Sequence, residues 1–522
     1  MLSNIQKAWI LLVVAAICLA GCTSLKQYVH NGFKVGPNYH PPLAPVAQHW
    51  IDTNSPAVLN ESRELCCWWT VFNDPVLNRL VACACRQNLS LKEAGLRVLQ
   101  ARAQLGITVG NLFPQQQDAV ASYTREGIPV GDSGFGGGGF FDQWSFGFNL
   151  AWELDFWGRF RRAVAAQKDL LDASVEDYRN VQVTLLGDVA TNYVQIRIDQ
   201  QRIKLLETNV EVQRGVLDFI EKRFAARFHV SKLDLDQARS NLKQTEAQIP
   251  QLQINMRQSA NRLCILLGIP PQELEDMLGE GMIPTSPLDV AAGIPAELLR
   301  RRPDIRRAER QAAAQAEEIG IAESDLYPAF TLSGSLGYRA QNFSDLFSSQ
   351  AFNGNIGPSA QWNILNYGRI VNNVRFQDAH FQELVLVYQN TVLQAAEEVE
   401  NGLVTFMRSH QQAEFLNESV KASQSAVNIA ILQYKTGASD FNRYALIEQN
   451  LVQQQDLQAQ ALGQIALGLI QVYRSLGGGW KYSPSTLPPE TLPPVTSPPS
   501  AAAKPEEVPL PAPDPTLPTQ SP

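Results

Sequence analysis

The sequence predicts an α+β membrane protein in which membrane-spanning strands alternate with very long helices, in two copies of one unit. Three observations carry this prediction. Residues 144–156 alternate apolar and polar side chains, two stretches of more than sixty residues contain no proline, and an aromatic-Gly-Arg sequence occurs twice, at Gly158 and Gly368. The length of 522 residues alone would suggest about three domains, but internal repetition overrules that expectation.

The clearest expected strand is the segment WSFGFNLAWELDF at 144–156. Apolar residues occupy every second position from Trp144 to Phe156, and small or polar residues lie between them. A membrane-spanning strand needs about 9–11 residues, with apolar side chains on one face. A half-buried strand of a soluble protein is the alternative. The length and the aromatic ends favour the membrane interpretation.

Three further strands complete the expected set. FTLSGSLGY aligns Phe330 and Tyr338 on one face, and IGPSAQWNIL at 356–365 aligns Ile356 and Trp362. A weaker pattern near 118–124 is included because its counterpart in the second copy is clear. The expected irregular loops at the ends of the two strand pairs are the glycine-rich residues 125–143 and residues 340–355.

The helices are expected to form two long hairpins. Each first helix starts at the arginine after the repeated glycine, each second helix follows a short polar turn, and their length suggests coiled-coil packing. The expected helices cover residues 159 to about 224, about 233–267, 369 to about 434 and 441–476, with turns at 226–232 and 435–441.

The N-terminus is a processing signal. Lys7 is followed by an apolar run at 9–20, which is too short to span a bilayer and fits a secretory signal. Leu-Ala-Gly-Cys then resembles a bacterial lipobox, in which Cys22 becomes the acylated first residue; an ordinary signal peptide is the alternative. Thr23 follows the acylated cysteine, and the absence of Asp there favours sorting to the outer membrane.

Five cysteines remain after the lipobox: Cys66, Cys67, Cys83, Cys85 and Cys264. An oxidising periplasm would allow a disulfide between the first pair and the second pair. Zinc is a weaker alternative, because no histidine lies beside them and CC and CxC are not the usual ligand spacing. Free buried thiols are the third interpretation, and the sequence does not choose between thiols and a disulfide.

The number of strands and the charge both bear on partners. Four strands are too few to close a membrane barrel, which starts at about eight strands. Several chains joined by cyclic symmetry would solve this, and three chains would supply twelve strands. The net charge of -8 and the pI near 5.5 argue against a nucleic-acid partner.

Several motifs together resemble the TolC-like outer-membrane efflux factors, in the lipoprotein branch similar to OprM and NodT-type proteins. They are LLRRRPDIRRAE at 298–309, VGPNYHPP at 35–42, the FWGR and NYGR junctions, and the LFP and LYP pair. The resemblance covers most of residues 22–480. It implies a trimeric duct, in which each chain gives four strands to a 12-stranded outer-membrane β-barrel and long helices to a periplasmic α-helical barrel.

The resemblance also implies a function and partners. The family provides the passive exit duct of tripartite efflux systems for drugs or other toxic solutes, loaded by a periplasmic adaptor and an inner-membrane pump, often of the RND type. The channel of a type I protein secretion system shares the fold and is the alternative. Enzymatic motifs such as GxSxG, HExxH and a P-loop are not found, so neither catalytic residues nor cofactors are expected.

The expected domain organisation follows from the repeats. It comprises a signal peptide with lipobox at 1–21, an N-terminal equatorial segment at 22–75, a first repeat at 76–275, a linker at 276–295, a second repeat at 296–480 and a Pro-rich tail at 481–522, expected to be disordered or polyproline-like.

The RRPDI segment is expected to be structural. Pro303 and Asp304 fit the start of a helix, where proline is tolerated and a carboxylate can accept bonds from free amides. Arg301 and Arg302 are expected to pair with carboxylates or carbonyls of neighbouring elements. Gly158 permits the turn at the first junction, and Gly368 matches it in the second copy.

The candidate functional residues lie at the second hairpin turn. In similar proteins, acidic residues near this turn ring the closed periplasmic aperture, and Asp440 is nearest to that place. Lys435 and Arg443 are its candidate cationic partners. A solvated aspartate that caps the following helix is the alternative for Asp440. At the first turn, the family usually has glycine where this chain has Phe228, while Gly437 keeps the pattern at the second.

Overall fold

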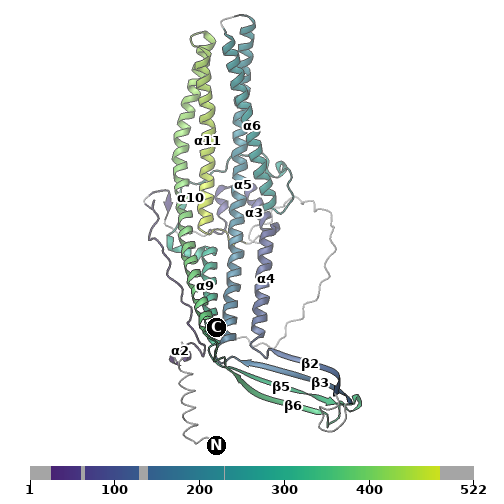
Figure 1. Cartoon of the computed structure of the whole chain (residues 1–522). Helices are drawn as coiled ribbons and strands as arrows, with labels where there is room; N and C mark the ends of the chain where they lie inside the picture. The colour runs from purple at the N-terminus through teal and green to yellow at the C-terminus, as the bar shows by residue number, and fades with distance from the viewer. Residues whose placement is uncertain (1–24, 54, 60–64, 129–138, 228–229, 483–522) are drawn as a thin grey trace. The chain divides into compact units, whose positions relative to one another are not determined.

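The computed structural model describes residues 25–53, 55–59, 65–128, 139–227 and 230–482 (Figure 1). Its main elements occur in one order twice, helix-strand-strand-helix-helix. The first set is α4 (Leu89–Gly110), β2 (Gln116–Ile128), β3 (Gly139–Leu154), α5 (Arg159–Ala225) and α6 (Lys232–Leu266). The second set is α9 (Pro303–Ser324), β5 (Ala329–Ala340), β6 (Phe352–Gln361), α10 (Arg369–Thr436) and α11 (Phe441–Ser475). The expected twofold internal repeat is therefore present.

The four strands form one antiparallel sheet in the order β2-β3-β5-β6. Its central pair joins the two repeats, because β3 lies against β5 with Phe146 opposite Tyr338 and Trp152 opposite Leu332. Apolar side chains thus share one face of the sheet, as the period-two pattern predicted. The outer strands β2 and β6 each have one edge without a partner among the described residues.

The strand boundaries differ from the predicted ones at both ends. β3 begins five residues earlier than expected and ends at Leu154, so Asp155 and Phe156 are not in the strand. The glycine-rich segment was expected to be irregular throughout. That was wrong for residues 125–128 and 139–143, because the β2–β3 backbone ladder continues through them and needs no side chains. Residues 129–138 lie outside the described part.

The last strand was also misplaced. β6 covers 352–361 rather than 356–365, and it includes residues 352–355 of the expected loop. Trp362 directly follows the last paired residue of β6, and its indole Nε1 donates a hydrogen bond to the carbonyl of Leu326, at 2.9 Å. The weak first strand is longer than expected, at Gln116–Ile128.

The long helices pair as two antiparallel hairpins, α5 with α6 and α10 with α11, and α5 also contacts α11, α9 and α4. The two hairpins lie alongside each other with their turns at the same end (Figure 1). Close to the turns, a shared apolar core joins all four helices. Its buried members include Ile220, Leu235, Val427, Tyr434 and Phe441. The predicted hairpins are confirmed.

Shorter elements lie between, beside and within the repeats. They are α2 (Leu25–His30), β1 (Val58–Leu59), η1 (Trp68–Phe72), α3 (Pro75–Gln87), α7 (Glu275–Leu278), β4 (Val290–Ala291), η2 (Pro295–Glu297), α8 (Leu298–Arg301) and η3 (Phe343–Asp345). β1 and β4 form a parallel pair that connects the N-terminal segment to the linker between the repeats. None of the helices described here is both long and apolar enough to cross a membrane.

No disulfide joins the five remaining cysteines in this structure. Cys83 and Cys264 are buried, and burial raises the pKa of Cys83 and raises the pKa of Cys85 to about 12. The described part of the chain holds no cluster of His, Cys, Asp and Glu with the arrangement of a metal site. Among the three interpretations, the structure therefore supports free thiols.

Candidate functional site

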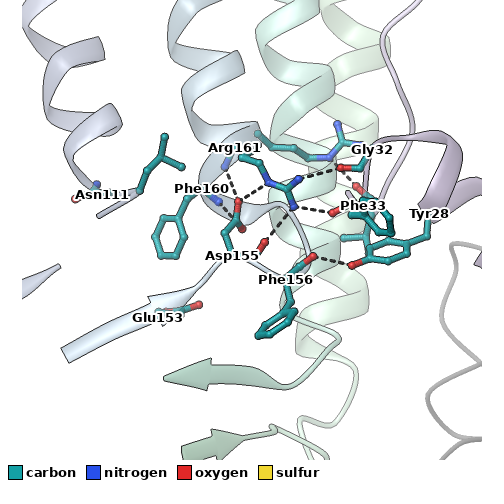
Figure 2. A network of polar contacts seen from close by, with 12 residues as sticks. Tyr28, Gly32, Phe33, Asn111, Glu153, Asp155, Phe156, Phe160 and Arg161 are labelled. Atoms are coloured by element: carbon teal, nitrogen blue, oxygen red, sulfur yellow. Dashed lines mark hydrogen bonds and ion pairs between the residues drawn. The ribbon is translucent and has the colours of Figure 1, made fainter. Parts of the chain in front are cut away.

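The first strand-to-helix junction is organised by Asp155. Its carboxylate accepts hydrogen bonds from the backbone amides of Phe160 and Arg161, at 3.1 and 3.0 Å, and from Nε of Arg161 at 2.9 Å (Figure 2). These amides belong to the first turn of α5, which has no intrahelical acceptors for them. Gly158 turns the chain with φ +83°, and a Cβ there would lie 2.5 Å from the Lys34 side chain. The strand therefore ends, and the helix begins, within four residues.

Two arginines of this junction hold the N-terminal segment, Leu25–Gly36, which we call the anchor segment. Arg161 donates to the carbonyls of Gly32 and Phe33, at 2.9 and 2.7 Å (Figure 2). Arg162 is fully buried and donates to the carbonyls of Val35 and Gly36, at 2.6 and 2.9 Å. The anchor segment is therefore bound to α5 through its backbone.

The close packing around Arg162 explains why two nearby positions are occupied by glycine. Arg162 also pairs with Glu317 of α9 at 2.6 Å. A Cβ on Gly320 would lie 2.2 Å from Nε of Arg162, and a Cβ on Gly36 would lie 2.6 Å from Cα of Gly320. Any side chain at either glycine would push the anchor segment away from α9. Gly36 of the VGPNYHPP motif is thus required by packing.

Aromatic residues complete this junction. Trp157 stacks on Tyr327 with ring centroids 4.6 Å apart, and the Tyr28 ring lies 5.7 Å from Trp157. The Tyr28 hydroxyl donates to the carbonyl of Phe156 at 2.8 Å (Figure 2). At the second junction the corresponding Tyr367 has φ +49° and is 97% exposed, beside Gly368 at φ +80°. The contacts of the anchor segment given above are all made at the first junction.

The RRPDI segment connects three helices at the other end of α9. Pro303 is the first helical residue, and Asp304 accepts a bond from the Ile305 amide. Arg302 pairs with Asp304 at 2.6 Å, with Glu398 of α10 at 2.7 Å, and donates to the Ser475 carbonyl at the end of α11. Arg301 pairs with Glu297 at 2.7 Å.

The arginines that follow the motif join α9 to α5. Their partners are carboxylates that the sequence analysis did not single out. The pairs are Arg306 with Glu176 at 2.6 Å, Arg307 with Asp177, and Arg310 with Asp169 at 3.1 Å. The sequence contained a signal for these ion pairs. The acidic residues at 169, 176 and 177 are spaced at helical intervals, and so are the arginines at 306, 307 and 310.

At the hairpin turns, the structure separates the three candidate residues. Asp440 is exposed and caps α11, accepting a bond from the Arg443 backbone amide at 2.8 Å rather than from its guanidinium. The Lys435 ammonium lies 6.0 Å from the Phe219 ring, and the Lys435 carbonyl accepts a bond from Arg223 of α5. No ion pair of Asp440 is found among the described residues, so the expected pairing within one chain is absent.

A buried carboxyl near the same turns was missed. Glu448 lies two turns into α11, 6% exposed, and shares a side-chain hydrogen bond with Tyr444. Burial raises the pKa of Glu448 to about 7 and also raises the pKa of Tyr444. The sequence contained a signal for this residue, because Glu448 is a carboxylic acid within the apolar stripe formed by Phe441, Tyr444 and Leu451.

Two residues of interest lie outside the described part, Cys22 and Phe228. Among the described residues of the first turn, Arg227 takes the left-handed conformation, with φ +53°. It stands where Gly437, with φ +77°, stands in the second turn.

Comparison with known proteins identifies the family to which this chain belongs. Residues 80–269 and 294–478 match the family described as "Outer membrane efflux protein", and the chain belongs to that family. It is therefore an outer-membrane channel component of a tripartite efflux system, with a TolC-like fold and a periplasmic extension. The family is one of channels rather than enzymes.

Individual relatives agree with this assignment. Nodulation protein T of Rhizobium leguminosarum bv. trifolii is 31% identical over 78% of this chain and 86% of that protein. Pyoverdine export outer membrane protein OpmQ of Pseudomonas putida is 30% identical over 80% of this chain and 89% of that protein. The solved structure of the outer-membrane channel OprN matches with a TM-score of 0.81 and 33% identity, over 85% of this chain and 99% of that one.

Proposed function

We propose that the chain works as a homotrimer whose three sheets close one twelve-stranded barrel, forming a passive exit duct for small molecules without enzymatic activity. The observation that carries this proposal is the sheet order β2-β3-β5-β6, which leaves one free edge on β2 and one on β6. In lipid, unpaired backbone groups at such edges cost several kcal/mol each, so the edges must be paired. Pairing β6 of one copy with β2 of the next satisfies both.

The proposed partners are those of a tripartite pump. A periplasmic adaptor would bind the hairpin end of the duct, and an inner-membrane pump, of the RND type, would supply the solute and the energy. Two observations support these partners. The relative OpmQ is named for the export of pyoverdine, and the chain matches the outer membrane efflux protein family.

We also propose that residues 1–21 are removed as a signal peptide and that Cys22 is acylated in the outer membrane. The bound anchor segment supports this, because it follows Cys22 closely in the sequence and is fixed beside the strand-to-helix junction. Radiolabelled palmitate should be incorporated into the wild-type protein and not into Cys22→Ser. Labelling of the Cys22→Ser protein at the wild-type level would disprove lipidation at this cysteine.

For the hairpin end, we propose that three copies of Asp440 ring the periplasmic aperture and give the closed duct its cation preference. Asp440 is exposed and carries no ion pair in the described structure, so its charge is available to passing ions. Three carboxylates around one axis would also attract cations to relieve their mutual repulsion.

The test separates charge from capping. Asp440→Asn keeps a side-chain cap for α11 and removes the charge. Ser231→Ala removes the equivalent cap of α6 at the first turn without changing charge. In planar bilayers, we expect Asp440→Asn to lower the cation-to-anion permeability ratio by severalfold and Ser231→Ala to leave it unchanged. Wild-type selectivity in the Asp440→Asn channel would remove Asp440 from this role, while absence of any conductance in the wild-type protein would contradict the duct itself.

A further inference from the structure

Two adjacent cysteines, Cys66 and Cys67, form a pair of thiols that has no part in the contacts described so far. Their sulfur atoms lie 3.8 Å apart, so they touch but are not bonded to each other. Both side chains are partly exposed, whereas Cys83 and Cys264 are buried. A reagent in the surrounding solvent can therefore reach the pair.

The pair lies where the N-terminal segment, α3 and the end of the described chain meet. Cys67 directly precedes η1, and its carbonyl accepts bonds from the backbone amide and the hydroxyl of Thr70, at 3.1 and 2.8 Å. Burial raises the pKa of the Tyr482 hydroxyl to about 12, and charge on Cys85, Cys67 or Cys66 raises it further. Thiols of η1 and of α3 thus gather around Tyr482.

The two thiols of α3, Cys83 and Cys85, are poor nucleophiles. Only a thiolate attacks a disulfide, and burial raises the pKa of both residues, in Cys85 to about 12. Cys83 also directs its sulfur to Oε1 of Gln87, at 3.6 Å. An external disulfide is therefore expected to react at Cys66 and Cys67 rather than at α3.

The location of the pair in the molecule exposes it to oxidants. The chain is an outer-membrane channel component with a periplasmic extension, and disulfides form and persist in the periplasm. The helix α3, which contacts η1, packs against the long helix α5 and lies away from the sheet (Figure 1). The pair is therefore on the periplasmic side of the membrane strands.

We propose that Cys66 and Cys67 are a reversible oxidation site, whose reaction partner is a reactive disulfide such as that of a periplasmic thiol-disulfide oxidase. The thiolate of one cysteine attacks a sulfur of that disulfide, forms a mixed disulfide and releases the other sulfur as a thiol. The second cysteine then attacks the first, forming the bond between Cys66 and Cys67 and releasing the remaining thiol. The pair gives up two electrons and two protons, and the reagent disulfide gains them. This site goes beyond the proposed duct and does not depend on its trimeric state.

The neighbouring positions of the two cysteines make such a bond easy to reduce again. Consecutive Cα atoms lie about 3.8 Å apart across a trans peptide, whereas the Cα atoms of disulfide-bonded residues are usually roughly 4.4–6.8 Å apart. A disulfide outside the usual geometry is strained, and strained or exposed disulfides are more easily reduced than structural ones. The modification is therefore reversible rather than a permanent brace.

Oxidation loosens the packing of the two tryptophans that follow. Trp68 stacks on Tyr473 of α11 with ring centroids 5.6 Å apart, and the Trp69 ring lies 5.0 Å from that of Tyr482. Both indoles are buried, and their Nε1 atoms have no hydrogen-bond partner among the described residues, so water can satisfy them when η1 opens. A ring of two residues removes little entropy from the unfolded chain, so its strain in the folded state is not offset.

Peptide mapping of the full-length protein tests the site. Isolated outer membranes are treated with oxidised glutathione, unreacted thiols are alkylated under denaturing conditions, and the protein is digested with trypsin. One expected peptide, 64–79, contains Cys66 and Cys67, and the next, 80–86, contains Cys83 and Cys85. We expect peptide 64–79 without alkylation and lighter than its dithiol form by two hydrogen atoms. Treatment of the folded protein with reduced glutathione before alkylation should restore the dithiol.

The other products of this experiment would overturn the proposal. A dialkylated peptide 64–79 would show that the pair does not react, and a product joining 64–79 to 80–86 would place the disulfide between η1 and α3. A bond that reduced glutathione breaks only after unfolding would contradict the reversibility.

Two cysteine variants provide matched controls. Cys66→Ser should leave one glutathione attached to Cys67, because the second thiol that displaces it is missing. Cys83→Ser should give the wild-type product. A Cys66→Ser protein in which Cys67 bonds to a cysteine of α3 would overturn the assignment of the pair.

Amide hydrogen exchange tests the effect on η1. Oxidation should make the backbone amides of residues 68–72 exchange at least threefold faster in the wild type and in Cys83→Ser. The same treatment of Cys66→Ser should have a smaller effect, because no strained ring forms. Unchanged or slower exchange in the oxidised wild type would contradict the loosening.

Discussion

Arg162 shows how a single buried charge fixes one segment to another at the residue scale. Its guanidinium is fully buried, and its donors reach two carbonyls of the anchor segment and the carboxylate of Glu317. A buried guanidinium is tolerated only when it is paired and hydrogen-bonded in this way. The anchor segment accepts the Arg162 bonds through backbone carbonyls, and Gly36 and Gly320 allow the close contact that these bonds require.

Glu448 makes the packing near the hairpin turns depend on pH. The pKa of its carboxyl is raised from 4.5 to about 7, chiefly by burial. Between these values the unfolded chain gives up its proton while the folded chain keeps it. Stability contributed by the neutral carboxyl is therefore fully present below about pH 4.5, is lost as the pH rises towards 7, and changes no further above that, a loss of about 3 kcal/mol.

We therefore expect amide hydrogen exchange in residues 441–451, corrected for intrinsic rates, to become faster relative to pH 5 when measured at pH 7.5. Glu448→Gln should abolish this difference, because the amide keeps the size of the side chain and does not titrate. Glu418→Gln, at an exposed carboxyl of α10, is the matched control and should retain it. A Glu448→Gln protein with the wild-type pH dependence would show that another group is responsible.

At the scale of elements, the two hairpins differ in how the first long helix ends. α10 ends at Gly437 in the left-handed conformation, whereas the equivalent residue after α5 is Arg227. A residue with a Cβ pays roughly 1 kcal/mol or more in that conformation, and glycine does not. The first turn is therefore strained by comparison with the second.

The repeats provide reciprocal variants for testing this strain. Arg227→Gly should stabilise the first turn by about 1 kcal/mol, and Gly437→Ala should destabilise the second by about the same amount. The measurement is the free energy of local opening from hydrogen exchange at the last turns of α5 and α10. Changes of the same sign in both variants would contradict this account.

At the scale of the whole molecule, the repeat, the sheet and the hairpins could be predicted because each depends on a periodicity that is recognisable in the sequence alone. The strand ends were wrong where backbone pairing, rather than side-chain pattern, decides them, as at residues 139–143 and at the end of β6 after Gln361. At the candidate sites, the sequence predicted that Arg302 would pair, but its partners Glu398 and Ser475 lie far along the chain and follow only from the packing of three helices.

The sheet order has a further consequence for how the chain acquires its structure. The hairpins β2–β3 and β5–β6 are local, but the contact that unites them pairs Leu154 with Phe330 and Trp144 with Ala340. Because the chain emerges from its N-terminus, the first strand pair must wait, with one edge of β3 unpaired, until both long helices of the first repeat and β5 have been delivered. Closing so long a loop is slow. During this interval the apolar strands need protection from aggregation, so assembly rather than stability is the stage at which this fold is most vulnerable.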